Sequence, residues 1–275
     1  MGSNILYRLM NNTKVITFNV RCAGPWDLSP NSWEERLPRI HNFLAEERPA
    51  LFGVQEANIH QATGLAEATG YCFIGGGRDD FHARGELCAI FYDPMCLEVL
   101  DWGNFSLSDN PAVPGVCAWN AAYPRMATWG FFRELASGQR FSCYNTHLDH
   151  ISEEAQIKGL TLILSQMASH YADVPQLLMG DFNATPDSPV WTLASTELED
   201  ARGIAMKEIS GPQNATYHNW GQSAKVIDYI FVSRGLTVLN YRVDDRMVDG
   251  GYLSDHYPVI VELMFGATRR PLVLA

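Results

Sequence analysis

The chain has 275 residues, of which 47% are hydrophobic and 19% are charged, and its formal net charge is −11 at pH 7. This composition supplies a large apolar core and excludes a disordered or fibrous chain. The acidic balance, with no Lys/Arg run longer than the pair Arg269-Arg270, disfavours a protein that holds a long polyanion such as duplex DNA.

The first part of the chain alternates between strands and helices. We expect residues 1–12 to be frayed and Thr13–Val20 to form a strand. Ser32 and Glu35 fit a capping box, although Pro38 indicates that regular helix begins only there, and Pro49 ends it. The strand Leu51–Glu56 follows, and then comes a helix over Asn58–Thr69 that Gly70 closes.

The rest of the chain is dominated by strands. Gly103–Arg125 is long and rich in proline and aromatic residues, so it predicts a functional or disordered loop. Ser152–Tyr171 carries acidic residues in its first turn and an apolar stripe, which predicts a helix. The further predicted strands are Tyr71–Ile74, Glu86–Tyr92, Cys96–Trp102, Met126–Leu135, Arg140–Thr146, Gln176–Asp181, Lys225–Val232, Leu236–Val243 and Tyr257–Met264.

The polar motifs are spread from Asn19 to His256, so both halves of the chain must meet at one site. We therefore expect a single domain over residues 13–265 and a C-terminal tail over 266–275. The six cysteines lack C-x-x-C spacing, and several lie in apolar runs, which predicts reduced thiols in the core. Without a signal-peptide core or an apolar run that could span a membrane, a cytoplasmic monomer is expected.

The stretch Leu177–Asn183 is a short apolar strand that stops at Gly180. Residues two apart in an extended chain share a face, so Asp181 and Asn183 point into one space. Burying a carboxylate and an amide costs free energy unless a charged group contacts them. A calcium-binding loop that begins at Asp181 is excluded, because Pro186 and Thr192 occupy its required Gly and Glu positions.

Other predicted strands also end in polar residues with a bias toward oxygen ligands. Carboxylates and amides at strand ends predict a site for a divalent metal ion, and histidines beside them suit proton transfer. The residues with this pattern, besides Asp181 and Asn183, are Asn19, Glu56, Asn145, His147, Asp149, Asp228, Asp255 and His256.

The order NVR…QE…NTHLD…GDFN…DYIFV…SDHYPV resembles the endonuclease/exonuclease/phosphatase superfamily, over roughly Thr13 to Met264. The packing of the predicted elements and the resemblance both indicate an α+β fold with two facing mixed β-sheets and helices outside, a four-layer α/β/β/α sandwich. The resemblance supplies the order of the layers. It also implies hydrolysis of a phosphoester with Mg²⁺ or Mn²⁺.

The resemblance assigns roles to the motif residues. Glu56, with Asn19 beside it and Asp255 on the metal side, would hold the ion. Asp181 would orient or activate the attacking water, and Asn183 would hold a phosphate oxygen. His147 would contact the phosphoryl oxygen or protonate the leaving group. His256 would accept a proton or polarise the phosphate, with Asp228 fixing its tautomer.

Further residues are expected to support the site or to contact substrate. Asn145 and Asp149 are supporting candidates. Arg78 lies in the loop Gly75–Asp80, whose backbone N–H groups could surround an anion, and Arg125 could also contact substrate. Aromatic residues could wall the pocket, and the remaining histidines are expected to be structural or on the surface. The aromatic residues are Trp26, Trp119 and Tyr123. The remaining histidines are His41, His60, His82, His150, His170 and His218.

The substrate is the open part of the prediction. The catalytic tyrosine motif of apurinic endonucleases is not visible, and Gln156 and Lys158 stand where many bacterial relatives carry an arginine. We expect a small or single-stranded phosphodiester, or a phosphorylated sugar or lipid head group. The alternatives are a DNA or RNA nuclease and a non-enzymatic scaffold that retains the fold.

Overall fold

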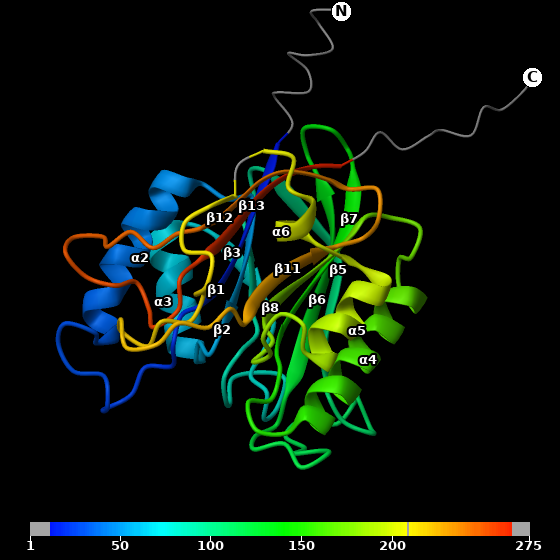
Figure 1. Ribbon diagram of the computed structural model, residues 1–275, viewed down its shortest axis with the longest axis horizontal. Helices are drawn as coiled ribbons and strands as arrows, with labels where there is room; N and C mark the ends of the chain where they lie inside the picture. The colour runs from blue at the N-terminus through cyan, green and yellow to red at the C-terminus, as the bar shows by residue number, and fades with distance from the viewer. Residues whose placement is uncertain (1–11, 208, 266–275) are drawn as a thin grey trace, which may run out of the picture.

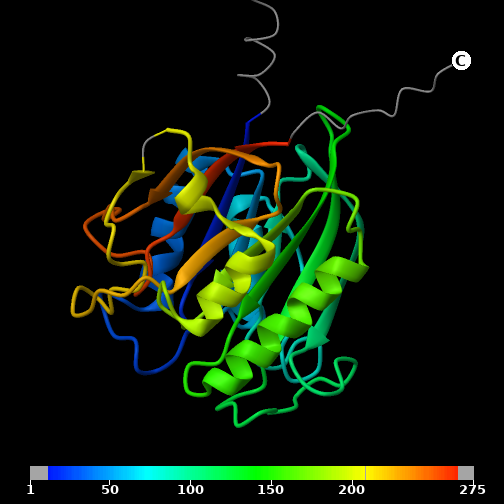
Figure 2. The same ribbon diagram turned by 45° about the vertical axis from the view of Figure 1, so that its right-hand side comes forward.

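Two β-sheets lie face to face in the computed structural model, which describes residues 12–207 and 209–265 (Figure 1). Helices α2 (Trp33–Glu47) and α3 (Ile59–Thr69) cover the outer face of one sheet, and α4 (Glu153–Ser169) and α5 (Pro189–Glu197) cover that of the other (Figure 2). A short helix, α6 (Ala201–Ile204), follows α5. The predicted four-layer α/β/β/α sandwich is confirmed.

Both sheets are mixed. In the first sheet β1 and β2 are parallel and β1 and β13 are antiparallel, with Thr13 paired to Leu263. In the second sheet β7 and β8 are parallel and β8 and β11 are antiparallel. The first sheet has the order β10 (Ile209–Ser210), β12 (Thr237–Val243), β13 (Val259–Met264), β1 (Thr13–Asn19), β2 (Leu51–Gln55), β4 (Ile90–Tyr92) and β3 (Cys72–Ile74). The second has the order β5 (Leu97–Ser106), β6 (Met126–Glu134), β7 (Arg140–His147), β8 (Gln176–Asp181), β11 (Asp228–Val232) and β9 (Glu199–Asp200).

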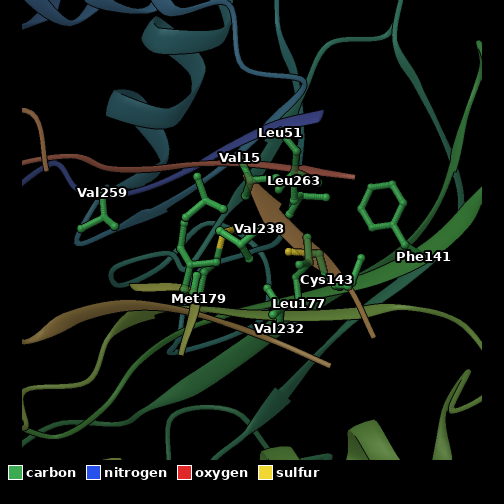
Figure 3. Close-up of a cluster of buried hydrophobic side chains, with 14 of the residues drawn as sticks. Val15, Leu51, Phe141, Cys143, Leu177, Met179, Val232, Val238, Val259 and Leu263 are labelled. Atoms are coloured by element: carbon green, nitrogen blue, oxygen red, sulfur yellow. The ribbon is translucent and has the colours of Figure 1, made fainter. Parts of the chain in front are cut away.

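Three separate apolar clusters hold the four layers together. The central cluster lies between the sheets, and its labelled members come from both of them (Figure 3). A second cluster packs α4 and α5 onto the second sheet, and a third packs α2 and α3 onto the first. The strands β1, β2 and β8 therefore bury both faces, which is why their sequences read as nearly continuous apolar runs.

The strand directions gather the polar motifs at one end of the sandwich. β1, β2, β7 and β8 all finish at this end, while the antiparallel strands β11 and β13 begin there. In the second sheet Asp181 is paired with His147 on one side and with Asp228 on the other. Residues far apart in the sequence thus reach one site from both sheets.

The start of α2 differs from the prediction. The helix begins at Trp33 and contains Pro38, because the Ser32 carbonyl already accepts from the backbone N–H groups of Glu35 and Arg36. The predicted capping box is wrong, since the Ser32 hydroxyl contacts the Glu35 carboxylate instead of a backbone N–H. A capping box is present at α3, between Asn58 and Gln61.

Several other boundaries also differ. β5 continues to Ser106, so the long loop covers 107–125, and only Ile90–Tyr92 of the strand expected over Glu86–Tyr92 is regular strand. The helix α5 was not predicted, although Ser188 as N-cap and Pro189 in the first turn are its sequence signal. All six cysteines are free, but only Cys88 and Cys143 are fully buried. Except for Asn12, the expected frayed start and tail lie outside the described residues.

Candidate active site

The centre of the site is an amide that joins two carboxylates from opposite sheets. Asn19, at the end of β1, donates from Nδ2 to Glu56 Oε1 at 2.9 Å and to Asp181 Oδ2 at 3.0 Å. Its own Oδ1 accepts from the backbone N–H of Arg21 at 2.9 Å. The three side chains therefore hold the ends of β1, β2 and β8 in one fixed arrangement.

Two residues of the candidate site adopt unusual backbone conformations. Glu56 has φ 64° and Asn183 has φ 50°, in the left-handed region. Asparagine tolerates this region, whereas for glutamate it is strained, and such strain concentrates at functional sites. The bend at Glu56 follows the last residue of β2 and turns its carboxylate toward Asn19 and the backbone N–H of Cys22.

His256 is held by an aspartate. Its Nδ1 lies 2.9 Å from Asp228 Oδ2, and Asp228 also accepts from the Thr216 hydroxyl at 2.6 Å. Burial alone would lower the pKa of His256, but the negative charges of Asp228, Asp181 and Asp255 raise it to about 10. The imidazole is therefore protonated at neutral pH, with Nε2 directed to the side of Asp181 at 3.8 Å.

His147 and Asp181 form the other half of the polar centre. Burial lowers the pKa of His147 well below its ordinary value, and the positive charges of Arg125 and His256 add to the effect. Its Nε2 lies 2.9 Å from Asn183 Nδ2, which suits a neutral ring that accepts a hydrogen bond. Burial and the charge of Asp228 raise the pKa of Asp181 to about 7, although His256 opposes the shift.

The donor groups fit a hard divalent cation. Among the described residues, Glu56, His147 and Asp181 offer ligand atoms within 4.8 Å of one another, and so do Asp181, Asp228 and His256. Carboxylate oxygens dominate the set, as Mg²⁺ and Mn²⁺ prefer. A cation would offset both the burial and the repulsion from Asp228 that raise the pKa of Asp181. Because the ring of His256 is protonated and bound to Asp228, the first group suits a metal better than the second.

A pocket opens beside this centre, between the loops 75–86 and 107–125. Arg78 and Arg125, the two arginines expected to contact substrate, line it. The Cζ atom of Arg78 lies 4.9 Å from the centroid of the Tyr123 ring, and that of Arg125 lies 5.9 Å from it. The other lining residues are Glu56, Glu86, Leu87, Cys88, Pro124, Met126 and His147. Trp26 and Trp119 do not line it: Trp26 is 63% exposed, and Trp119 donates to Asp109.

Two of the expected site residues, Asn145 and Asp149, have structural partners instead. Asn145 is fully buried between the sheets, where its Nδ2 donates to the carbonyls of Val54 and Ala89, so it does not fit a substrate contact. Asp149 is also buried, and it accepts from Arg125 and from backbone N–H groups that include the helix N-cap Ser152. Its role is to position Arg125 and the start of α4.

Asp255 does not fit the expected metal ligand. Its Oδ2 accepts from Arg21 Nη1 at 2.6 Å, and its Oδ1 accepts from the Ser254 hydroxyl at 3.2 Å. Arg21 also donates from Nε to Asp27 at 2.8 Å. Asp255 is thus the partner of an arginine beside the site.

The loop Gly75–Asp80 does not form the expected anion nest. The N–H groups of Gly77, Arg78, Asp79 and Asp80 donate to carbonyls within the segment 77–86. What the loop supplies to the pocket is the Arg78 side chain. The sequence interpretation also missed Glu86, which lines the pocket, and His150, which was expected to be ordinary but accepts from Arg125 at 3.1 Å.

Comparisons with known proteins agree with this fold. A solved endonuclease/exonuclease/phosphatase from Bacteroides vulgatus has a TM-score of 0.88 and 32% identity, over 92% of this chain and 99% of that one. The mannosyl-6-phosphatase Bt3783 of Bacteroides thetaiotaomicron has a TM-score of 0.84 and 32% identity, over 92% and 100%. Protein angel of Drosophila melanogaster is 25% identical, over 82% of this chain and 70% of its own length.

The two facing sheets, with the polar centre at their shared end, have the deoxyribonuclease-like fold. The profile of the endonuclease/exonuclease/phosphatase family matches residues 16–256, and the chain belongs to this family. Members of the family act on phosphoester bonds. None of the described helices combines the length and the apolar character that a membrane crossing requires.

Proposed function

We propose that this protein is a Mg²⁺- or Mn²⁺-dependent phosphoesterase that hydrolyses a small phosphorylated substrate by direct attack of water. The observation that carries the proposal is the convergence of Glu56, His147 and Asp181 with the His256–Asp228 pair beside a pocket lined by two arginines. A scaffold that only retained the fold would have no need for this combination of buried charges, which is costly to assemble.

Each polar side chain of the site has its own role in the proposed hydrolysis. Glu56 and Asp181, with Asn19 beside them and His147 as a further donor, would hold the metal ion, which neutralises phosphate charge when bound. Asp181 accepts the proton of the attacking water. Asn183, expected to hold a phosphate oxygen, instead positions the ring of His147, because its Nδ2 donates to His147 Nε2 and to the Leu148 carbonyl. His256 supplies positive charge to the phosphoryl group as negative charge gathers on it, while Asp228 keeps the ring in place.

Several features support a compact substrate. The chain has a net charge of −11, and the two arginines at the pocket have carboxylate partners. Such a surface attracts a long polyanion weakly. A relative of 32% identity, covered over its full length, is a mannosyl-6-phosphatase, which supports a phosphorylated sugar or similar head group over a nucleic acid.

The test is a screen of the purified protein against sugar phosphates, mononucleotides, phospholipid head groups and oligonucleotides, with Mg²⁺, with Mn²⁺ and with excess chelator. We expect Glu56→Gln to reduce kcat/KM by about 100-fold or more. Glu98→Gln is the matched control, because Glu98 is a partly exposed carboxylate that pairs with Arg133 on β6.

Two outcomes would contradict the proposal. Full activity in chelator, or in Glu56→Gln, would remove the metal from the reaction. A strong preference for long duplex DNA, lost steeply as salt increases, would identify a nuclease instead, because such a slope reports the number of phosphates that are neutralised.

A further inference from the structure

The pocket beside the polar centre contains a carboxylate that phosphate binding does not explain. Glu86 lines the pocket together with Glu56 and His147. A carboxylate repels a phosphate and accepts hydrogen bonds only. It belongs to neither of the two clusters of metal-ligating groups found among the described residues.

Among the described residues, only one of the two carboxylate oxygens of Glu86 has a hydrogen-bond partner. Its Oε2 accepts from Arg78 Nη1 at 2.7 Å, while within residues 12–207 and 209–265 no hydrogen bond reaches its Oε1. The Glu86 side chain is 25% exposed to solvent. Arg125 is likewise paired with Asp149, at 3.4 Å, so each arginine of the pocket has an acidic partner. The wall is therefore close to neutral and offers both donors and acceptors, which suits alcohol hydroxyls.

An aromatic ring lies next to this pocket, against its two arginines. Tyr123 is 50% exposed, and it packs over the guanidinium groups of Arg78 and Arg125. The ring of His150 is stacked with it, with the centroids 5.9 Å apart and the planes at 19°. A half-exposed ring whose position is fixed by such neighbours provides a flat apolar surface next to polar groups, the usual composition of a small-ligand site.

The loops that carry these residues are held in place. A Cβ on Gly76 or Gly77 would lie 2.0 Å from a backbone oxygen of the same loop, so only glycine permits this tight fold. The backbone N–H of Gly115 donates to the Arg78 carbonyl at 2.9 Å and joins the loop 107–125 to the loop of Arg78. The loop of Arg78 and the loop of Tyr123 are therefore joined before any ligand binds, and a ligand does not have to order them.

We propose that Glu86, Arg78 and Tyr123 form a sugar subsite and that the substrate is a monosaccharide carrying one phosphate. Glu86 accepts hydrogen bonds from ring hydroxyls through its free oxygen, Arg78 donates to a hydroxyl, and Tyr123 packs against the C–H face of the sugar. This inference rests on the proposed phosphoesterase activity and adds the group that the enzyme selects. Glu86 and Tyr123 are specificity residues, since neither touches the phosphorus centre.

The experiment compares a hexose 6-phosphate with phenyl phosphate, which has the same reacting group but no hydroxyls. For Glu86→Gln and Tyr123→Ala we expect kcat/KM on the hexose phosphate to fall by roughly 10- to 100-fold, the range of a hydrogen bond to a charged group. The loss should lie mainly in KM, and kcat/KM on phenyl phosphate should stay close to that of the wild type. Tyr123→Phe should restore the sugar activity, because it keeps the ring.

The controls separate this subsite from folding and from the proposed function. Trp102→Ala removes a ring of similar exposure, 46%, on β5, and should change neither substrate. Tyr123 is half exposed, so its variants should fold even if Glu86→Gln does not. Equal losses of kcat/KM on both substrates would overturn the sugar subsite. It would also be overturned if the wild type preferred a mononucleotide to the hexose phosphate and lost that preference in Tyr123→Ala. If the wild-type protein hydrolyses phenyl phosphate and does not prefer the hexose phosphate, the sugar subsite is overturned and the proposed function stands. If the protein is inactive on every phosphoester, both the proposed function and the subsite are overturned.

Discussion

Glu56 combines a chemical role with a strained backbone. Its φ of 64° is one that glycine adopts freely and that other residues adopt at a cost of about 1–2 kcal/mol. The bend lets the residue leave β2 and turn its carboxylate toward Asn19. The protein thus gives up stability at this position to place a ligand between the sheets, which is typical of functional sites.

This strain can be measured. Glu56→Ala and Glu56→Gly both remove the carboxylate, so we expect both to be inactive. Only glycine relieves the left-handed backbone, and part of that gain is offset by the greater freedom of glycine in the unfolded chain. Glu56→Gly should therefore be about 0.5–1 kcal/mol more stable than Glu56→Ala in urea unfolding without added metal. An alanine variant that is equally or more stable would show that the bend carries no strain.

The sequence predicted much of the site because strand-end motifs are local patterns. Asn19, Glu56, His147, Asp181, Asn183, Asp228 and His256 were all singled out, and the structure brings them together. Asp255 and Asn145 have the same residue types in the same motifs, but whether such a side chain faces the pocket or a buried partner depends on the opposite sheet. Glu86 and His150 gain their positions from loops, whose folds no periodicity indicates.

At the scale of the elements, the two sheets meet closely where β2 passes β7 and β8. A Cβ on Gly53 would lie 2.8 Å from Asn145 Cγ and 2.6 Å from Met179 Cε. The missing side chain leaves room for the Asn145 amide, which binds the carbonyls of Val54 and Ala89 in the first sheet. The distance between the sheets, and so the distance between Glu56 and Asp181, is set here.

Gly53→Ala should therefore affect both stability and activity. Overpacking a filled core costs about 1–3 kcal/mol, and we expect a loss of that size in the free energy of unfolding. Because the shift moves β2 against β8, kcat should fall although no polar residue of the site has changed. Gly64→Ala in α3 is the control: its new Cβ would lie 3.9 Å from Leu37, and helix propensity should stabilise it. An unchanged Gly53→Ala enzyme would refute this account of the sheet spacing.

The strands of the fold could be predicted from apolar runs, and Gln176–Asp181 was predicted at its observed bounds. Helices were predictable where caps and stripes agreed, as over Glu153–Ser169. The start of α2 was wrong because tertiary contacts override the local preference at Pro38: the buried Arg36 donates from Nε to Asn31 and from Nη2 to Arg21. Arg21 and Arg36 are 15 residues apart, and a contact over such a separation leaves no signal in a short window of sequence.

At the scale of the whole molecule, an ion-pair network fastens the layer of α2 to the first sheet. Glu47, at the end of α2, pairs with Lys14 of β1 at 3.0 Å and with Arg242 of β12 at 2.7 Å. Arg246 also reaches it, at 2.7 Å. Burial would raise the pKa of Glu47, but the hydrogen bonds from Arg242 and Lys14 lower it.

The lowered pKa of Glu47 fixes the direction of a pH effect. Its stabilisation is present above the ordinary glutamate pKa of about 4.3 and is lost as the pH falls through the lower pKa of the folded protein. We expect Glu47→Gln to cost about 1–2 kcal/mol at pH 7, a value kept modest by solvent screening of its partners, and less as the pH falls below about 4. Thermal unfolding across this pH range tests it, with Glu98→Gln as the exposed-pair control; a cost that does not depend on pH would argue against the network.

The antiparallel pairing of β1 with β13 places the first and the last strand of the described fold side by side. Thr13 and Leu263 are neighbours across a hydrogen-bonded ladder, at the end of the sandwich opposite to Asn19 and His256. A short linker could therefore join these positions, and new ends could be opened in the exposed turn at Ser137-Gly138, without breaking a layer. Such a circular permutant would keep every catalytic group on its own strand, so the order of the strands along the chain could be redesigned independently of the chemistry.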